Sequence, residues 1–142
     1  MTKPNVVQPY LLTFENRKKY LLARVDGELD SPAISLQYWS RVAAVCERSG
    51  FSKVLVVEAL AKNLLLPDAF RTSCAFRHED FLGLKIAFVD LYDEHAAVND
   101  FNINMSTRRG VNIRSFPGVK EAENWLLDDE AATLKVTVAA RC

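Results

Sequence analysis

The sequence predicts a single α/β domain with a mixed, mostly parallel sheet of about five strands, an N-terminal β-hairpin and about four helices. Short apolar runs of strand length alternate with segments whose apolar residues recur at helical spacing. Parallel strands need crossover connections, so this alternation favours a largely parallel sheet in the order β-β-α-β-α-β-α-β-α. The 142 residues suit one domain, which we expect to cover residues 1–128, and no repeat or low-complexity linker divides them.

The first two strands are expected to form a hairpin that adds an antiparallel edge to the sheet. The run Tyr10–Glu15 (YLLTFE) and the run that starts at Tyr20 (YLLARVDGEL) flank the polar segment NRKK. The clearest helix follows, with Ser31 as N-cap, Pro32 at the first helical position and Gly50 just past the end. Its predicted apolar face consists of Ile34, Tyr38, Trp39, Val42, Val45 and Cys46.

The rest of the chain predicts three more strand and helix units. The apolar runs that begin at Lys53 (KVLVVEAL) and Leu84 (LKIAFVDLY) are typical of strands covered on both faces. The other elements are expected at 66–81 (helix), 93–109 (helix), 111–116 (edge strand) and 118–129 (helix). Their predicted apolar faces are Ala69, Phe70, Ser73, Cys74 and Phe81 on the first of these helices, Ala97, Val98, Phe101 and Met105 on the second, and Val119, Ala122, Trp125 and Leu126 on the third. The tail 129–142 predicts either an extra strand or a disordered end.

Charge and cysteine usage restrict the classes of partner. The 18 basic and 18 acidic side chains cancel, so no global field draws the chain onto nucleic acid, and we expect no nucleic-acid partner. No apolar stretch approaches the roughly 20 residues of a membrane span, so no integral membrane segment is expected. Three cysteines without a CxxC pair, and an N-terminus without a signal-peptide pattern, predict a cytoplasmic location.

Two segments carry a family resemblance: GLKIAFVDLYDE (Gly83–Glu94) and FNINMSTRRGVNIRSFPGVKEAENWL (Phe101–Leu126). With the early YLLARVDGEL and the helix after it, they resemble STAS-like proteins, the fold of the anti-sigma-factor antagonists, and especially their small uncharacterised bacterial relatives. The resemblance extends over about Tyr20–Leu126. It implies a small mixed sheet with packed helices and a regulatory or protein-interaction role. The related CRAL-TRIO-type folds bind lipids, a more distant analogy.

One departure from the family concerns its phosphorylation switch. The antagonist branch carries its phosphorylated serine or threonine in an Asp-Ser-Ser/Thr-Gly turn after the central strand. The corresponding region here reads VVEALAKNLLLPDAF. We place Glu58 near the family's aspartate, but no hydroxyl follows before Thr72, so no phosphosite is carried over.

The known catalytic patterns are missing from the sequence. The five glycines are dispersed, without a phosphate-binding loop, and no GxSxG elbow occurs. Cys74 lies four residues before His78, which we interpret as a buried helical cysteine and not as a nucleophile. His78 and His95 each adjoin carboxylates, but consecutive helical residues point about 100° apart, so no metal site is expected. We therefore predict a chain that is not an enzyme and holds no cofactor.

The carboxyl ends of the parallel strands are the expected place for a site, because ligands of open α/β sheets bind there. Glu58 and Asn63 follow one such end, and Asp90 and Tyr92 follow the next. Asp93 and Glu94 are interpreted as groups that cap the next helix, with acid–base work as the alternative.

Two further groups of residues have both a structural and a binding interpretation. Leu64, Leu65 and Leu66 either fill the core or form an apolar lip for a partner or ligand. Arg108 and Arg109 fit the negative end of a helix that Gly110 terminates, and Arg114 fits an edge strand. An acidic partner bound to Arg108, Arg109 and Arg114 is the alternative.

Three functions follow from these observations, in descending order of preference. The first is a non-enzymatic STAS-like regulatory or protein-interaction module that forms a homodimer. The alternative is a carrier or sensor of a small apolar, lipid-like ligand in a pocket near the loop after the central strand. The last is a hydrolase-type enzyme that uses the strand-end carboxylates with His95.

Overall fold

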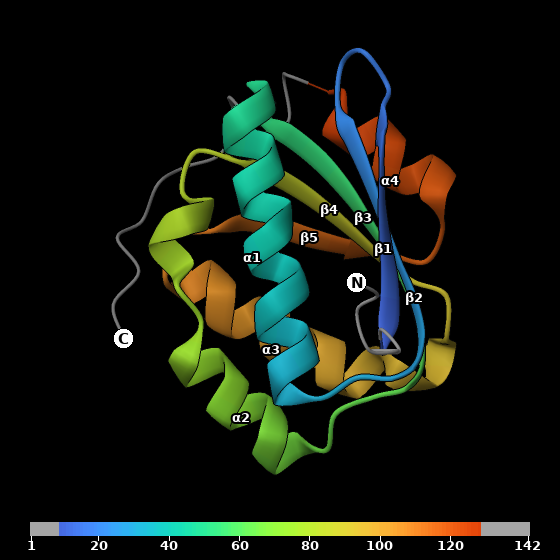
Figure 1. Ribbon diagram of the computed structural model, residues 1–142, viewed down its shortest axis with the longest axis vertical. Helices are drawn as coiled ribbons and strands as arrows, with labels where there is room; N and C mark the ends of the chain where they lie inside the picture. The colour runs from blue at the N-terminus through green and yellow to red at the C-terminus, as the bar shows by residue number, and fades with distance from the viewer. Residues whose placement is uncertain (1–8, 129–142) are drawn as a thin grey trace, which may run out of the picture.

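The computed structural model describes residues 9–128, which form an α/β domain around one five-stranded sheet (Figure 1). The strands are β1 (Tyr10–Asn16), β2 (Leu21–Leu29), β3 (Lys53–Lys62), β4 (Lys85–Asp90) and β5 (Asn112–Phe116). They lie in the order β1-β2-β3-β4-β5, with β1 antiparallel to β2 and all other neighbours parallel. The predicted fold class, hairpin and edge position of β5 are confirmed. The predicted tail 129–142 lies outside the described residues.

The helices form layers on both faces of the sheet. They are α1 (Pro32–Ser49), α2 (Leu66–Ala75), α3 (Ala96–Arg108) and α4 (Val119–Leu126), with short 3-10 helices η1 (His78–Phe81) and η2 (Asp93–His95). Right-handed crossovers between strands that neighbour each other in chain order place α1, α2 and α3 on the same face. Helix α4 follows the last strand and covers the other face. None of the helices between residues 9 and 128 is long and apolar enough to cross a membrane.

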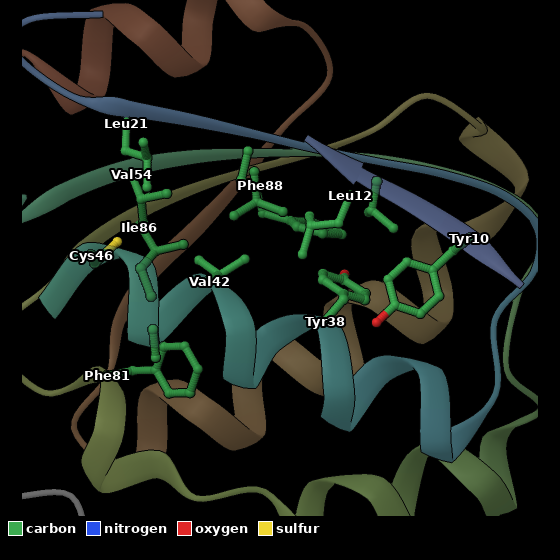
Figure 2. Close-up of a cluster of buried hydrophobic side chains, with 14 of the residues drawn as sticks. Tyr10, Leu12, Leu21, Tyr38, Val42, Cys46, Val54, Phe81, Ile86 and Phe88 are labelled. Atoms are coloured by element: carbon green, nitrogen blue, oxygen red, sulfur yellow. The ribbon is translucent and has the colours of Figure 1, made fainter. Parts of the chain in front are cut away.

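Helix α1 begins and ends as its sequence predicts. The Ser31 hydroxyl accepts a hydrogen bond from the Ile34 N–H at 3.1 Å, and Pro32 occupies the first helical position. Gly50 ends the helix in the left-handed region, with φ of 76°. The helix packs a stripe of buried side chains against the sheet, and Figure 2 shows Tyr38, Val42 and Cys46 of this stripe facing side chains from the strands.

The second helix is shorter than predicted and buries only part of its predicted face, including Ala69 and Ser73. It ends at Ala75 instead of Phe81, and the chain turns before it enters η1. Its buried residues are the small side chains Ala69, Thr72 and Ser73. The predicted Phe70 and Cys74 are exposed, because large side chains on this helix point away from the sheet.

The third helix also presents an unexpected face to the interior. The predicted stripe is exposed at Ala97, and its other members are half-buried. The buried residue of α3 is Asn99, which lies on the same face as Asn102, Ile103 and Ser106 because their spacing is helical. The physical reason is that this face of α3 borders polar groups and a cavity. In α4, Ala122 and Leu126 are buried as predicted, whereas Trp125 is half-buried and Val119 is exposed.

Candidate ligand-binding site

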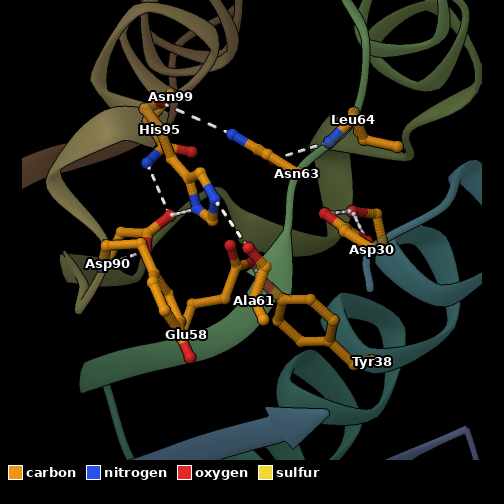
Figure 3. A network of polar contacts seen from close by, with 11 residues as sticks. Asp30, Tyr38, Glu58, Ala61, Asn63, Leu64, Asp90, His95 and Asn99 are labelled. Carbon is orange, nitrogen blue, oxygen red and sulfur yellow. Dashed lines mark hydrogen bonds and ion pairs between the residues drawn. The ribbon is translucent and has the colours of Figure 1, made fainter. Parts of the chain in front are cut away.

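Three buried carboxyl side chains gather at the carboxyl edge of the sheet (Figure 3). Asp30 directly follows β2, Glu58 lies in β3, and Asp90 ends β4. Strands β2, β3 and β4 are parallel, so their carboxyl ends meet at the same edge. Buried carboxyl groups are costly unless they are hydrogen-bonded or paired, and each of the three has such partners.

Asp90 forms an ion pair with the buried imidazole of His95. The His95 Nδ1 atom lies 3.0 Å from Asp90 Oδ2, and Nε2 lies 3.2 Å from the carbonyl oxygen of Ala61. A carbonyl oxygen only accepts, so Nε2 carries a hydrogen. The Asn99 amide donates to the same Asp90 oxygen at 2.8 Å. Both ring nitrogens of His95 are therefore occupied within the protein.

Glu58 is held as a buried carboxyl group beside Tyr38. The Tyr38 hydroxyl donates to Glu58 Oε2. Burial, followed by the charge of Asp30, raises the pKa of Glu58 well above its usual 4.5, and a hydrogen bond with Asp90 acts in the same direction. The hydrogen bond from Tyr38 opposes this shift. Glu58 consequently keeps its proton to a higher pH than an exposed glutamate does.

Asp30 is a buried carboxyl group that accepts hydrogen bonds from two serines. The Ser35 hydroxyl lies 2.9 and 2.8 Å from its two oxygens, and the Ser31 N–H donates to it at 2.8 Å. Burial raises the pKa of Asp30 to about 6, Asp90 adds to the rise, and the serine hydrogen bonds limit it. A pKa of about 6 favours the ionised form of Asp30 at pH 7.

A cavity of about 70 Å³ lies beside this cluster, between the sheet and helices α1, α2 and α3. On the helical side, α2 presents small side chains and α3 presents its polar face, so no large side chain of these two helices fills the space. Part of the wall is aromatic, with the Trp39 ring 6.0 Å from that of Phe88 and 5.9 Å from that of Phe81. Asp30, Glu58 and Asn99 supply a polar part of the wall.

Two polar atoms of residues in the cavity wall, Ser73 Oγ and His78 Nε2, have no hydrogen-bond partner among residues 9–128. Their residues are only 6% and 7% exposed. Arg109 Nη1 donates to the Ser73 carbonyl oxygen at 2.9 Å and lies 3.3 Å from His78 Nδ1. A guanidinium only donates, so Nδ1 accepts and Nε2 carries the hydrogen. Burial, and then the charge of Arg109, lowers the pKa of His78, which keeps the ring neutral.

These atoms give the cavity a defined binding chemistry. The His78 N–H needs an acceptor, and the Ser73 hydroxyl can donate or accept. A buried polar group without a partner costs about 1–3 kcal/mol. A ligand that supplies the missing partners removes this cost.

The structure brings together four of the residues predicted from strand ends. Glu58 and Asp90 belong to the cluster, and the Tyr92 ring lies 5.2 Å from that of His95. The Asn63 amide reaches the backbone oxygen of His95 at 3.5 Å.

Within both the predicted leucine group and the predicted arginine group, some side chains are buried or half-buried and others are exposed. Leu64 is buried, whereas Leu65 and Leu66 are 71% and 54% exposed. Arg108 and Arg114 are exposed, and Arg114 lies over the Phe116 ring at 5.5 Å. Arg109 is half-buried and directed at Ser73 and His78, so the three arginines do not share one surface.

Several residues of the site were not predicted. Asp30 could have been found from the sequence, because it follows a strand parallel to β3 and obeys the same rule as Glu58 and Asp90. Ser73, His78 and Asn99 gave no such signal, because their role depends on how α2, η1 and α3 pack.

Comparisons with known proteins do not assign the chain to a family. No protein-family model matches it, and no curated protein does. The resemblance to STAS-like proteins therefore stays a prediction. Among residues 9–128, no group of three or more His, Cys, Asp and Glu side chains is placed to hold a metal ion.

Proposed function

We propose that this chain is a non-enzymatic, STAS-like regulatory module that binds a small molecule in the cavity beside Asp30. The observation that carries the proposal is the pair of unpartnered buried atoms, Ser73 Oγ and His78 Nε2, in the wall of a 70 Å³ space. That space is several times the roughly 10–15 Å³ that one water molecule needs. Protein interiors are normally close-packed and their polar groups paired, so this combination favours a binding site over a packing defect.

The polar wall favours a polar ligand over the lipid-like one that the sequence suggested. A lipid chain would leave the Ser73 and His78 groups unpaired and would lie against the Asp30 carboxylate. The aromatic part of the wall suits a short apolar segment only.

The state of His95 supports binding over catalysis. A general base needs a nitrogen that can reach a substrate proton. Both nitrogens of His95 are occupied, by Asp90 and by the Ala61 carbonyl. We assign His95 a structural role, in which it holds Asp90 and the Ala61 backbone in place.

Helix α2 lies between the cavity and an exposed apolar surface, so it connects the ligand site with a candidate surface for a protein partner. Its inner face lines the cavity, while Leu65, Leu66 and Phe70 at its start are each more than half exposed. Exposed apolar side chains of this kind are typical of protein-interaction sites. The homodimer expected from the sequence would use such a surface, and light scattering at tens of micromolar tests it.

Native mass spectrometry of freshly purified protein tests ligand binding. We expect a bound small molecule, or hits from a fragment library, that are lost in Ser73→Val. This variant removes a hydroxyl from the cavity wall. Cys74→Val is the matched control, because it places the same side chain on the same helix at an exposed position. The proposal fails if neither measurement finds a ligand, or if both variants bind it as the natural chain does.

A further inference from the structure

The cavity carries opposite charges toward its two ends. Asp30, whose carboxylate accepts hydrogen bonds from Ser31 and Ser35, lies at one end together with Glu58. The other end contains His78 and Ser73, and the guanidinium of Arg109 stands directly behind them. A matching ligand has a cation at the first end and an anion at the second.

Helix α3 shows how far apart these ends lie. Asn99 and Ser106 both line the cavity and are seven residues apart, which corresponds to about 10 Å along the helix axis. Asn99 hydrogen-bonds Asp90 of the acidic cluster, and Arg109 follows Ser106 by less than one turn. The acidic and basic ends are therefore separated by about the same length.

The volume limits the shape of the occupant. A volume of 70 Å³ is about half of the ~150 Å³ in which an engineered apolar cavity takes up benzene. Spread over the length of two helical turns, this volume favours a narrow, unbranched occupant.

We propose that the cavity binds an unbranched ω-amino carboxylic acid, with its ammonium group toward Asp30 and its carboxylate toward His78 Nε2 and Ser73 Oγ. This inference rests on the proposed function and names the ligand class. The His78 N–H and the Ser73 hydroxyl are the donors that a carboxylate accepts from, and the Asp30 carboxylate accepts from the ammonium. The methylene chain lies against Trp39 and Phe88 and buries apolar surface there.

Charge complementarity excludes the two nearest alternatives of similar shape. A diamine places its second cation against the Arg109 end, and a dicarboxylic acid places its second anion against Asp30. Either arrangement buries two like charges near one another, which low-dielectric surroundings penalise.

Isothermal titration calorimetry with the full chain tests the proposal. The probes are γ-aminobutyrate, δ-aminovalerate and ε-aminocaproate, with caproate and hexylamine as controls that each lack one charged end. We expect at least one amino acid to bind, and both controls to bind at least about tenfold more weakly, because each loses a charge-assisted hydrogen bond. The dependence on chain length measures the distance between the two ends.

Variants locate the binding. Asp30→Asn should weaken the best amino acid about tenfold or more and leave caproate unchanged. Glu28→Gln is the matched control, since it removes a carboxylate from an exposed position two residues earlier, in β2. If Asp30→Asn fails to fold, as seen by circular dichroism, Ser73→Val against Cys74→Val gives the same comparison at the other end.

The outcomes separate this inference from the proposed function. No binding of any amino acid at millimolar concentration, or caproate or hexylamine binding equally well, overturns the ω-amino acid. If fragments or a co-purified molecule then still bind and are lost in Ser73→Val, the proposed function stands without it. If nothing binds in either experiment, both are wrong.

Discussion

Replacing Asp30 by asparagine should remove a pH dependence from the stability of this domain. Asparagine keeps an oxygen that accepts from Ser35 and from the Ser31 N–H, so the local hydrogen bonds survive. It cannot ionise, so the cost of a buried charge disappears. The other charged or titratable groups that act on Asp30 are Asp90, His95 and Glu58, and all three stay in place.

The size of the effect follows from the change in pKa on folding. Folding raises the pKa of Asp30 from 3.8 to about 6. At about 1.4 kcal/mol for each pH unit, this difference corresponds to about 3 kcal/mol. Because the folded state holds the proton more tightly, the contribution is fully present below pH 3.8 and is lost as the pH rises through 6. The natural chain should therefore lose about 2.5 kcal/mol relative to Asp30→Asn between pH 4 and pH 7.

Urea denaturation of both chains at several pH values, followed by tryptophan fluorescence, measures this difference. The comparison between the two chains cancels titrations that they share. Parallel curves of unfolding free energy against pH would refute the assignment of a raised pKa to Asp30. If the natural chain instead became more stable relative to Asp30→Asn as the pH rises, folding would have to lower the pKa of Asp30.

Two further positions test the polar cluster and the second core. Glu58→Gln keeps an acceptor for the Tyr38 hydroxyl, whereas Glu58→Ala leaves it unpaired beside a new void, so the alanine variant should be about 2–4 kcal/mol less stable than the glutamine variant in urea. Equal stability of the two would mean that the Tyr38 contact contributes nothing. Leu126→Ala empties a fully buried site between α4 and the sheet and should lower the unfolding free energy by about 2–5 kcal/mol at an unchanged urea slope. A change under about 0.5 kcal/mol would show that α4 is not packed as described.

The secondary structure could be predicted where local signals agree. Helix α1 has a serine N-cap, a proline at its first position and a terminal glycine, and both of its ends were predicted. Helix α2 lacks a side-chain cap and a terminal glycine, and its end was predicted six residues too late. Without a stop signal, the turn before η1 is decided by how Phe76 and Phe81 stack in the core.

The site was predicted in part, for a similar reason. Glu58 and Asp90 follow from the rule that carboxyl ends of parallel strands meet. The inner face of α3 was assigned wrongly and that of α2 in part, because an apolar stripe was assumed to mark the buried side: Ala69 and Ser73 are buried as predicted, whereas Phe70 and Cys74 are exposed. Here the buried sides contain Ser73 and Asn99, and they are buried because they face a cavity and an ion pair.

By itself, the sequence determined the order of strands and helices, the parallel sheet and the edge at which carboxylates gather. These features follow from local periodicity, capping and chain connectivity, which any segment carries with it. Only the tertiary structure decided that Asp30 joins that edge, that Arg109 turns inward to fix the tautomer of His78, and that a polar cavity remains beneath α2. Those outcomes depend on which side chains meet across four separate elements, and spacing within one segment does not contain that information.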